Sequence, residues 1–280
     1  TAMGQATQDA DLIAAQGRLL RKRAELGVTV NHTRLTENFK IPKLEAVEPK
    51  KAQAADLCQH GMAKNYCDDC AVERWKNSLR DTLSNITPLI RQACAPAKYF
   101  NSTFDNFIGN EKLIDELKKH EIGNLVLYGN TGCGKTHLAV AMMRQAIITD
   151  INRILGLNWE WNNKPQILTP RFVPAPELLL EIRQSFRDGS PISEADVIKK
   201  YCEAGLLILD DLGSEKTSEY SITTLYIIID RRDRELLPTI ITTNLSQKEV
   251  EEKLGARIAS RLAGMKNIKI NMPDYRKKRG

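Results

Sequence analysis

Hydrophobic and polar positions alternate differently in the two parts of this chain. From about residue 101 onward, short apolar runs predict buried strands, and the longer stretches between them carry apolar residues at helical spacing. The expected strands are Leu125–Tyr128, Gln166–Thr169, Leu206–Asp210, Thr239–Thr243 and Asn267–Asn271. The expected helices are Glu111–His120, Thr136–Thr149, Pro176–Arg187, Glu194–Glu203, Tyr220–Glu235 and Gln247–Leu254. This alternation predicts an α/β fold with a five-stranded parallel sheet.

The first 95 residues lack this regular alternation. Asp9–Leu26 has helical spacing, and Ala71–Gln92 reads mostly as helix, with Pro88 as an interruption. We therefore predict a small helical N-terminal region at residues 1–95 and an α/β domain at residues 96–280.

The composition fits a globular protein. Hydrophobic residues make up 42% of the 280 residues, which is enough for a sizeable core, and the net charge of +6 permits contact with nucleic acid without requiring it. No apolar run reaches the roughly 18 residues that a transmembrane helix needs, so we expect no membrane span. The first residues do not have the character of a signal peptide. Six cysteines in such a chain indicate a reducing compartment, and we expect the cytosol.

The strongest motif is a glycine-rich loop between an expected strand and an expected helix. It consists of Gly129, Asn130, Thr131, Gly132, Cys133, Gly134, Lys135 and Thr136, and it matches G-x-x-x-x-G-K-T, the phosphate-binding loop of nucleoside triphosphatases. The glycines let backbone N–H groups turn toward phosphate oxygens, and the helix N-terminus adds a partial positive charge. We expect Lys135 to reach the β- and γ-phosphates and Thr136 to ligate Mg²⁺.

Two further expected strands end in polar residues. The run Leu206–Asp211 ends in two carboxylates, of which Asp210 is expected to hold Mg²⁺ and Asp211 to orient or deprotonate an attacking water. Asn244 follows the strand Thr239–Thr243, and ligands collect where parallel strands end, so it is expected to point at the γ-phosphate or the water. The alternative for each is an ordinary strand followed by a polar turn.

These elements together resemble the AAA+ ATPases. Within that group, Leu254–Leu262 is similar to the box VII segment of the DnaC/DnaI family of bacterial and phage helicase loaders, and Asp274–Arg276 resembles the C-terminal sensor 2 segment of that family. Phe104–Phe107 and Thr136–Ala139 are also similar to segments of this group. The resemblance covers roughly residues 100–279 and implies that the nucleotide is ATP.

The resemblance implies roles for particular basic residues. Arg261 matches the arginine finger, which enters the ATP site of a neighbouring subunit, and Arg276 matches the sensor 2 arginine, which contacts ATP in its own subunit. Arg257, one helical turn before Arg261, is a supporting candidate. In the family, the expected helices Pro176–Arg187 and Glu194–Glu203 correspond to a wedge that lines a path for single-stranded DNA. Its candidate phosphate contacts here are Arg183, Arg187, Lys199 and Lys200. The alternative for all of them is ordinary surface charge.

One position departs from the commonest AAA+ pattern. In most AAA+ proteins, the apolar strand that corresponds to Leu206–Asp211 ends in Asp-Glu, whereas this chain has Asp210 followed by Asp211. The shorter Asp211 carboxylate reaches less far toward the water, so we expect ATP hydrolysis to be slow. We also expect single-stranded DNA to stimulate it.

A second cluster has the residue types of a zinc site. Cys58, His60, Cys67 and Cys70 offer four ligands, and Cys67 and Cys70 have the spacing of a zinc knuckle. Four protein ligands would close the coordination sphere, so we expect a structural Zn²⁺ that stabilises a small N-terminal fold. Only one residue separates Cys58 from His60, which is tighter than usual, and the alternative is a set of unrelated thiols.

Taken with the resemblance, the sequence predicts an ATP-dependent loader of the replicative DNA helicase in a bacterial or phage system. The expected partners are the hexameric helicase, held by residues 1–95 with their zinc cluster at residues 58–70, single-stranded DNA, and further copies of the chain through the ATPase domain. One alternative is a transposition helper ATPase of the IstB type, which shares the ATPase core. Another is an adaptor that binds nucleotide without hydrolysing it.

Overall fold

The structure is a computed structural model that describes residues 58–59, 67–120, 122–186 and 191–275. The chain divides into two compact units. Among the described residues, the first unit comprises residues 87–147 and 168–275, and the second comprises residues 58–86 and 148–167. The helix expected at Asp9–Leu26 lies outside the described residues, and the boundary between residues 95 and 96 stays a prediction.

The first unit is built on a five-stranded parallel sheet, as the hydrophobic pattern predicts. Its strands are β1 (Leu125–Tyr128), β2 (Pro170–Pro174), β3 (Leu206–Leu212), β4 (Thr239–Thr243) and β5 (Lys266–Lys269), in the order β2-β3-β4-β1-β5. Every neighbouring pair is parallel. The carboxyl ends of β1, β3 and β4 therefore share one edge of the sheet, and the sequence motifs follow these strands.

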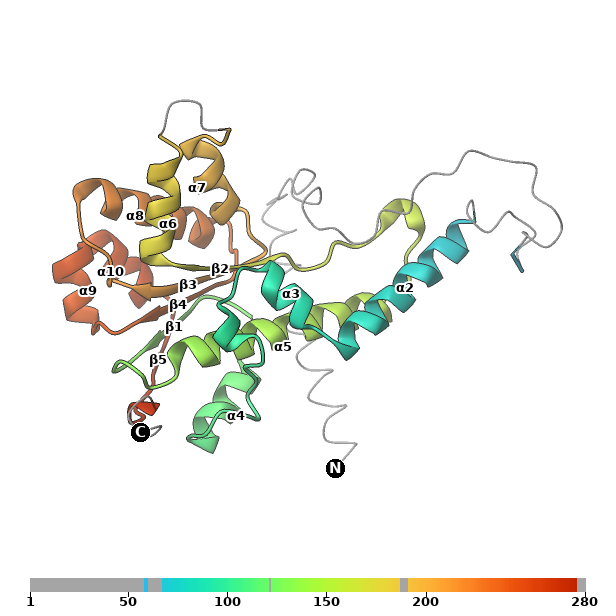
Figure 1. Ribbon diagram of the computed structural model, residues 1–280, viewed down its shortest axis with the longest axis horizontal. Helices are drawn as coiled ribbons and strands as arrows, with labels where there is room; N and C mark the ends of the chain where they lie inside the picture. Colours follow the sequence, from blue (N-terminus) through green and yellow to red (C-terminus); the bar gives the residue numbers. More distant parts are fainter. Residues whose placement is uncertain (1–57, 60–66, 121, 187–190, 276–280) are drawn as a thin grey trace. The chain divides into compact units, whose positions relative to one another are not determined.

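Helices cover both faces of this sheet. They are α3 (Thr87–Gln92), α4 (Glu111–Lys119), α5 (Lys135–Gly156), α6 (Ala175–Gln184), α7 (Glu194–Cys202), α8 (Glu219–Arg234), α9 (Gln247–Leu254) and α10 (Ala256–Ala263), with a short 3₁₀ turn η3 (Ala97–Tyr99). Figure 1 shows α5 below the sheet and α6 to α10 above it. Alternate strand residues, such as Val126, Leu207 and Ile241, face α6 to α10. Their side chains are almost fully buried in one cluster with apolar side chains of these helices. Burial of apolar side chains on both faces makes the strands read as continuous hydrophobic runs.

The expected helices are found, most of them with shifted ends and α9 with the expected bounds. Ser193, Ser218 and Ser246 each form a capping box that starts α7, α8 and α9, because the serine hydroxyl accepts a hydrogen bond from the free N–H three residues later. The helix expected at Thr136–Thr149 continues to Gly156 as α5. The prediction ended it too early because a buried helix carries apolar residues around much of its circumference, which weakens the periodic pattern.

The predicted strand at Gln166–Thr169 is wrong. The strand lies four residues later, as β2, and it begins with Pro170 and ends with Pro174. Proline lacks the N–H of a sheet hydrogen bond, so a segment with two prolines does not read as a strand. Here β2 lies at the edge of the sheet beside β3 only, where the missing donors are tolerated.

A buried arginine holds the amino ends of β3 and β4 to their flanking helices. Arg232 on α8 is fully buried, and its guanidinium donates to the Thr239 hydroxyl and to backbone carbonyls. The carbonyls belong to Tyr201, Cys202, Ala204 and Pro238, at 2.7–3.1 Å. Arginine suits this position because its planar fork presents five donors to acceptors that would otherwise lack partners.

The second unit packs one helix against a tryptophan-rich segment. α2 (Asp68–Ser84) presents the buried Trp75 to Trp159, with ring centroids 5.0 Å apart and the rings perpendicular. The Lys164 ammonium lies 4.6 Å from the centre of the Trp75 ring. The helix predicted at Ala71–Gln92 is interrupted, as expected, but at Asn85 and Ile86, because Pro88 is accommodated in the first turn of α3.

No helix among the described residues is both long and apolar enough to span a membrane.

Candidate functional site

The phosphate loop lies between β1 and α5, at the carboxyl edge of the sheet. Gly132 and Gly134 have φ values of 77° and 97°, in the left-handed region that favours glycine. A Cβ on Gly132 would lie 1.8 Å from Asp274 Oδ1, so the C-terminal segment requires glycine here. A Cβ on Gly134 would lie 2.5 Å from the Phe107 ring. The loop is therefore enclosed by segments from both ends of the first unit.

Lys135 and Asn244, far apart in sequence, lie together above the loop. The buried Lys135 ammonium donates to the Asn244 side-chain oxygen at 2.6 Å and to the carbonyls of Gly129 and Asn130 at 2.9 Å each. These acceptors keep the ammonium over the concave side of the loop, where phosphate oxygens bind in this motif. The arrangement suits a lysine that exchanges carbonyl partners for phosphate partners.

Asp210 lies at the junction of the loop helix and two strands. The Thr136 hydroxyl donates to its two carboxylate oxygens at 3.0 and 3.1 Å, and the Thr242 hydroxyl donates to Oδ1 at 2.6 Å. Burial raises the pKa of Asp210 to about 6, against the opposing effect of the hydroxyl donors. Thr136 and Asp210 are thus adjacent, as a shared Mg²⁺ ion requires.

Asp211 is turned away from Asp210 by an irregularity in the sheet. The register between β3 and β4 shifts between Leu209 and Leu212, and Asp211 has a φ of 53°, which is unusual for a residue with a side chain. Its N–H donates to the Thr242 hydroxyl at 2.9 Å. The bulge lets two consecutive carboxylates serve one site, because Asp211 lines the cavity described next while Asp210 stays buried.

A cavity of about 710 Å³ opens beside the loop, large enough for a nucleotide. It is lined by the loop residues Thr131, Gly132, Gly134, Lys135 and Thr136, by His137, Asp211, Asn244 and Tyr275, and by Lys98, Tyr99, Asn101, Ser102 and residues 106–108. The Tyr275 N–H donates to the Gly132 carbonyl at 3.1 Å, and its ring lies against Phe107. Arg276, the sensor 2 candidate, directly follows Tyr275 and lies outside the described residues.

Arg261 lies at the opposite edge of the sheet from the phosphate loop. Its guanidinium pairs with Asp230 at 2.5 Å and with Asp233 at 2.9 Å, both on α8. Asp233 in turn accepts a hydrogen bond from Asn124, the residue before β1, whereas the loop begins after β1. The length of β1, about 13 Å, separates the two, so Arg261 cannot reach its own phosphate loop. Arg257 is exposed on the same helix and lies over the Tyr226 ring.

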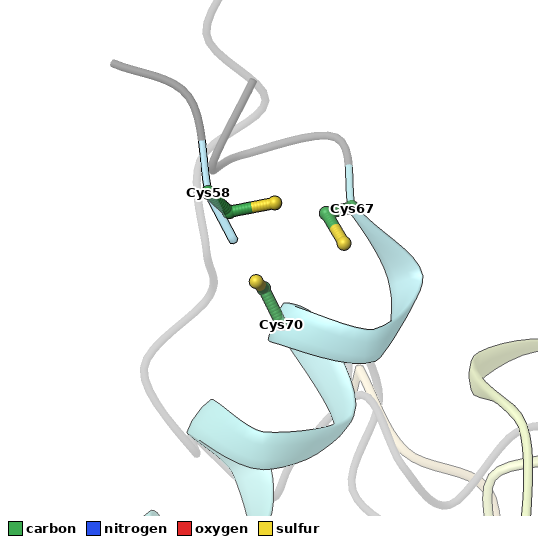
Figure 2. Close-up of side chains that lie close together, drawn as sticks. All are labelled: Cys58, Cys67 and Cys70. Atoms are coloured by element: carbon green, nitrogen blue, oxygen red, sulfur yellow. The ribbon is translucent and has the colours of Figure 1, made fainter. Parts of the chain in front are cut away.

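The structure brings three of the four predicted zinc ligands together. The sulfur atoms of Cys58, Cys67 and Cys70 all lie within 4.8 Å of one another, and Figure 2 shows them converging. Cys67 occupies the N-cap position of α2 without a side-chain hydrogen bond that caps the helix, and Cys70 lies in the first turn. Desolvation and the neighbouring thiols raise the pKa of Cys70 to about 11. His60 lies outside the described residues.

The candidate DNA contacts differ in their surroundings. Arg183 is exposed on α6, whereas Lys200 on α7 pairs with Glu181 at 2.7 Å. Lys199 lies 3.9 Å from Glu203, and Arg187 lies outside the described residues. The two lysines are therefore partly neutralised by neighbouring acids, and Arg183 is the better placed of the described three.

Two parts of the candidate site were missed by reasoning from the sequence. One is Thr242, which binds Asp210; its signal was a threonine inside an otherwise apolar strand beside the strand that bears Asp210. The other is the wall formed by residues 98–108, which we interpreted only as a linker. No sequence pattern within this segment indicates that it lines a cavity, because only the tertiary fold brings it beside the phosphate loop.

Comparison with known proteins places the chain among distant relatives. It is 25% identical over 174 residues to the replicative helicase loader DnaC of Buchnera aphidicola from Acyrthosiphon pisum, covering 59% of this chain and 64% of that protein. It is 21% identical over 260 residues to the DnaC loader of the Buchnera strain from Baizongia pistaciae, covering 89% of this chain and 97% of that protein. No protein-family profile matches the chain.

A solved structure shares the fold. The crystal structure of a DnaC helicase loader superimposes with a TM-score of 0.50 and 24% identity, covering 63% of this chain and all of that chain. The chain is therefore a distant homologue of the DnaC-type helicase loaders and has the AAA+ fold, as the sequence motifs predict.

The buried carboxyl of Asp210 predicts a specific pH dependence of stability. The pKa of Asp210 is raised from 3.8 to about 6, which means that the folded state disfavours the ionised carboxylate. The contribution of Asp210 to the free energy of unfolding is therefore fully present below pH 4 and is lost as the pH rises through 6. Without nucleotide or Mg²⁺, we expect the Asp210→Asn variant to gain about 2 kcal/mol relative to the unsubstituted protein between pH 4.5 and pH 7.5. Urea unfolding at both pH values measures this. Equal losses in the two proteins would contradict the prediction.

Proposed function

We propose that this distant relative of the DnaC-type loaders is an ATP-dependent loader that places a replicative DNA helicase on single-stranded DNA. The main support is the alignment that covers 89% of this chain and 97% of a relative that is a replicative helicase loader. An alignment of that extent includes the N-terminal region as well as the ATPase core, so the likeness is not confined to the phosphate loop. Such a protein acts in the bacterial cytosol, where the helicase and DNA are.

ATP binding rests on the residues around the cavity. Lys135 holds the β- and γ-phosphates together with the backbone N–H groups of the loop, and Thr136 and Asp210 hold Mg²⁺. The residues fit this ion, since a hydroxyl and a carboxylate, the oxygen ligands that Mg²⁺ prefers, already lie about 3 Å apart. Bound Mg²⁺ neutralises charge on the phosphates, and Asp210 must be ionised to hold it.

Hydrolysis requires a water placed in line with the γ-phosphate. Asp211 is the carboxylate exposed in the cavity, and Asn244 lies beside Lys135 at the position of a residue that senses the γ-phosphate. Asp211 orients the water or takes its proton. Because the side chain of Asp211 is one methylene shorter than that of glutamate, we propose that ATP hydrolysis is slow. We further propose that single-stranded DNA stimulates the hydrolysis.

Arg261 completes the site of a neighbouring copy. Its distance from its own phosphate loop excludes a role in its own subunit, and the pairing with Asp230 and Asp233 fixes the guanidinium near the surface. An arginine that enters a neighbour's site stabilises charge in the transition state. ATP binding thereby favours self-association, and hydrolysis releases it.

The test of Arg261 uses variants and mixtures. We expect Arg261→Ala to bind ATP normally and to lose hydrolysis by roughly 1,000-fold or to background, and Lys135→Ala to lose ATP binding. Mixing the two should restore part of the phosphate release, because each supplies what the other lacks. Arg257→Ala, on the same helix, is the matched control and should lose much less. Normal hydrolysis by Arg261→Ala alone would contradict the prediction.

The cysteine cluster holds a structural Zn²⁺ in this proposal, with His60 as the fourth ligand. The residues fit: tetrahedral zinc thiolates with bonds of about 2.3 Å place their sulfurs roughly 3.8 Å apart. The three sulfurs here all lie within 4.8 Å of one another, so small side-chain adjustments suffice. The ion ties the chain around Cys58 to the start of α2, which has no side-chain cap of its own. This fixes the N-terminal region that we propose binds the helicase.

Metal content tests this site directly. We expect one zinc per chain by elemental analysis after purification in zinc-supplemented medium, and its loss in Cys67→Ser and Cys70→Ser. Cys94→Ser is the matched control, because Cys94 is an exposed cysteine elsewhere, and it should keep the metal. Retention of zinc by both cluster variants would contradict the assignment.

Binding to the helicase tests the function itself. We expect a complex of defined mass between this protein and the replicative helicase of its source, seen by native mass spectrometry with ATP and weakened with ADP. Removal of residues 1–57 and the Cys67→Ser substitution should both weaken it. Residues 67–95 are kept because α2 covers Trp159, and their removal would expose that side chain.

The outcomes separate the loader from its alternatives. No helicase complex in any nucleotide state would contradict the loader, and binding to duplex DNA and a transposase would then favour an IstB-type helper. A helicase complex without multiple-turnover phosphate release, with or without single-stranded DNA, would favour a nucleotide-binding adaptor.

A further inference from the structure

The cavity has a wall that belongs to none of the nucleotide motifs. Residues 98–108 begin in η3 and run toward the start of α4, and seven of them line the cavity: Lys98, Tyr99, Asn101, Ser102, Asn106, Phe107 and Ile108. Tyr99, Asn101, Asn106 and Ile108 are among the residues exposed to it. Since the triphosphate occupies the loop, the ribose and base must lie in the remaining space, along this wall.

Residues 100–106 belong to no strand, so their position depends on side chains. Asn106 braces the segment from within: it donates to the Asn101 carbonyl at 2.7 Å and accepts from the Thr103 N–H at 2.9 Å. These bonds shape the segment without attaching it to the rest of the unit. Attachment requires contacts from a rigid element.

For residues 100–103 that element is α5, the helix that follows the phosphate loop, whereas Asp105 pairs with Lys118 of α4. Arg144 Nε donates to the Ser102 carbonyl at 3.2 Å, and its terminal nitrogen donates to the Phe100 carbonyl. His137 lies seven residues earlier on the same helix face, with Nε2 2.9 Å from the Thr103 carbonyl. Three successive parts of the segment are therefore fixed to the helix that also carries Lys135 and Thr136.

We propose that Arg144 is a positioning residue for the nucleoside half of ATP. It does not line the cavity, and it acts by holding the backbone of residues 100–102 at a fixed distance from the phosphate loop. Without it, two carbonyls lose a charged donor and residues 100–102 are held to α5 less firmly, while His137 and the phosphate loop keep their own contacts. The inference rests on the proposed ATP site and adds a residue that sets its affinity for the base and ribose.

Two ligands separate this role from general damage. ATP uses both the loop and the wall, whereas inorganic tripolyphosphate uses the loop alone, so calorimetry with each in Mg²⁺ reports the two halves separately. In Arg144→Met we expect about tenfold weaker ATP binding and tripolyphosphate binding within about twofold of the unsubstituted protein. KM for ATP should rise by a similar factor with kcat nearly unchanged.

Two further variants make the test specific. Arg144→Lys keeps the charge and one donor direction but lacks the fork, so its ATP affinity should fall between the other two. Arg153→Met removes an arginine from the same helix that pairs with Asp150, one turn away on that helix, and should leave both ligands unaffected.

Each outcome decides the inference. Unchanged ATP binding by Arg144→Met would overturn it. Equal losses of affinity for ATP and tripolyphosphate would also overturn it, because they would indicate general damage to the site. If Arg144→Met does not fold, the same two ligands are compared in Arg144→Lys. Failure of the unsubstituted protein to bind ATP at all would overturn the proposed nucleotide site itself. This result is distinct from normal ATP binding that is unchanged in Arg144→Met, which would overturn only the role of Arg144.

Discussion

The candidate site depends on one buried carboxylate. Asp210 ends a strand whose other residues are apolar, and it receives hydroxyl hydrogen bonds from the loop helix through Thr136 and from the adjacent strand through Thr242. Burial of a carboxylate is unfavourable unless it is hydrogen-bonded, so these three residues must stay together. The same constraint places the bulge at Asp211, because the strand must turn its second carboxylate toward the cavity. In the proposed ATP site, this carboxylate gives Mg²⁺ and the phosphates a position fixed by the sheet.

The two edges of the sheet carry different tasks. Lys135, Asp211 and Asn244 gather at the carboxyl edge, where the nucleotide cavity opens. At the amino edge, Arg232 binds the ends of β3 and β4 to their helices, and Arg261 is held by α8. A sheet of short parallel strands is rigid along its length. In the proposed assembly it therefore keeps a constant distance between the ATP that a subunit binds and the arginine that the subunit offers to its neighbour.

Much of the fold could be predicted from local patterns. β1, β4 and α9 have the bounds expected from the sequence, because short apolar runs and a serine cap carry their own signals. β2 could not be predicted, since its prolines are acceptable only at a sheet edge and edge position is a property of the whole sheet. Of the site, the glycine loop and both carboxylates were evident from their motifs. Thr242 and Arg144 were not, because a hydroxyl or guanidinium gains its role only from a partner distant in sequence.

The sequence by itself determined the chemistry: a phosphate loop, two carboxylates after an apolar strand, a polar strand end, and cysteines at metal-ligand spacing. These depend on residues close together in the chain, so spacing alone identifies them. Only the tertiary structure decided which distant residues meet. It brings Cys58 to Cys67 and Cys70, encloses the phosphate loop with residues 98–108 and Tyr275, and separates Arg261 from its own loop by the length of β1. The physical reason is that such meetings follow from strand order and helix packing, which the burial of apolar surface across the whole unit determines.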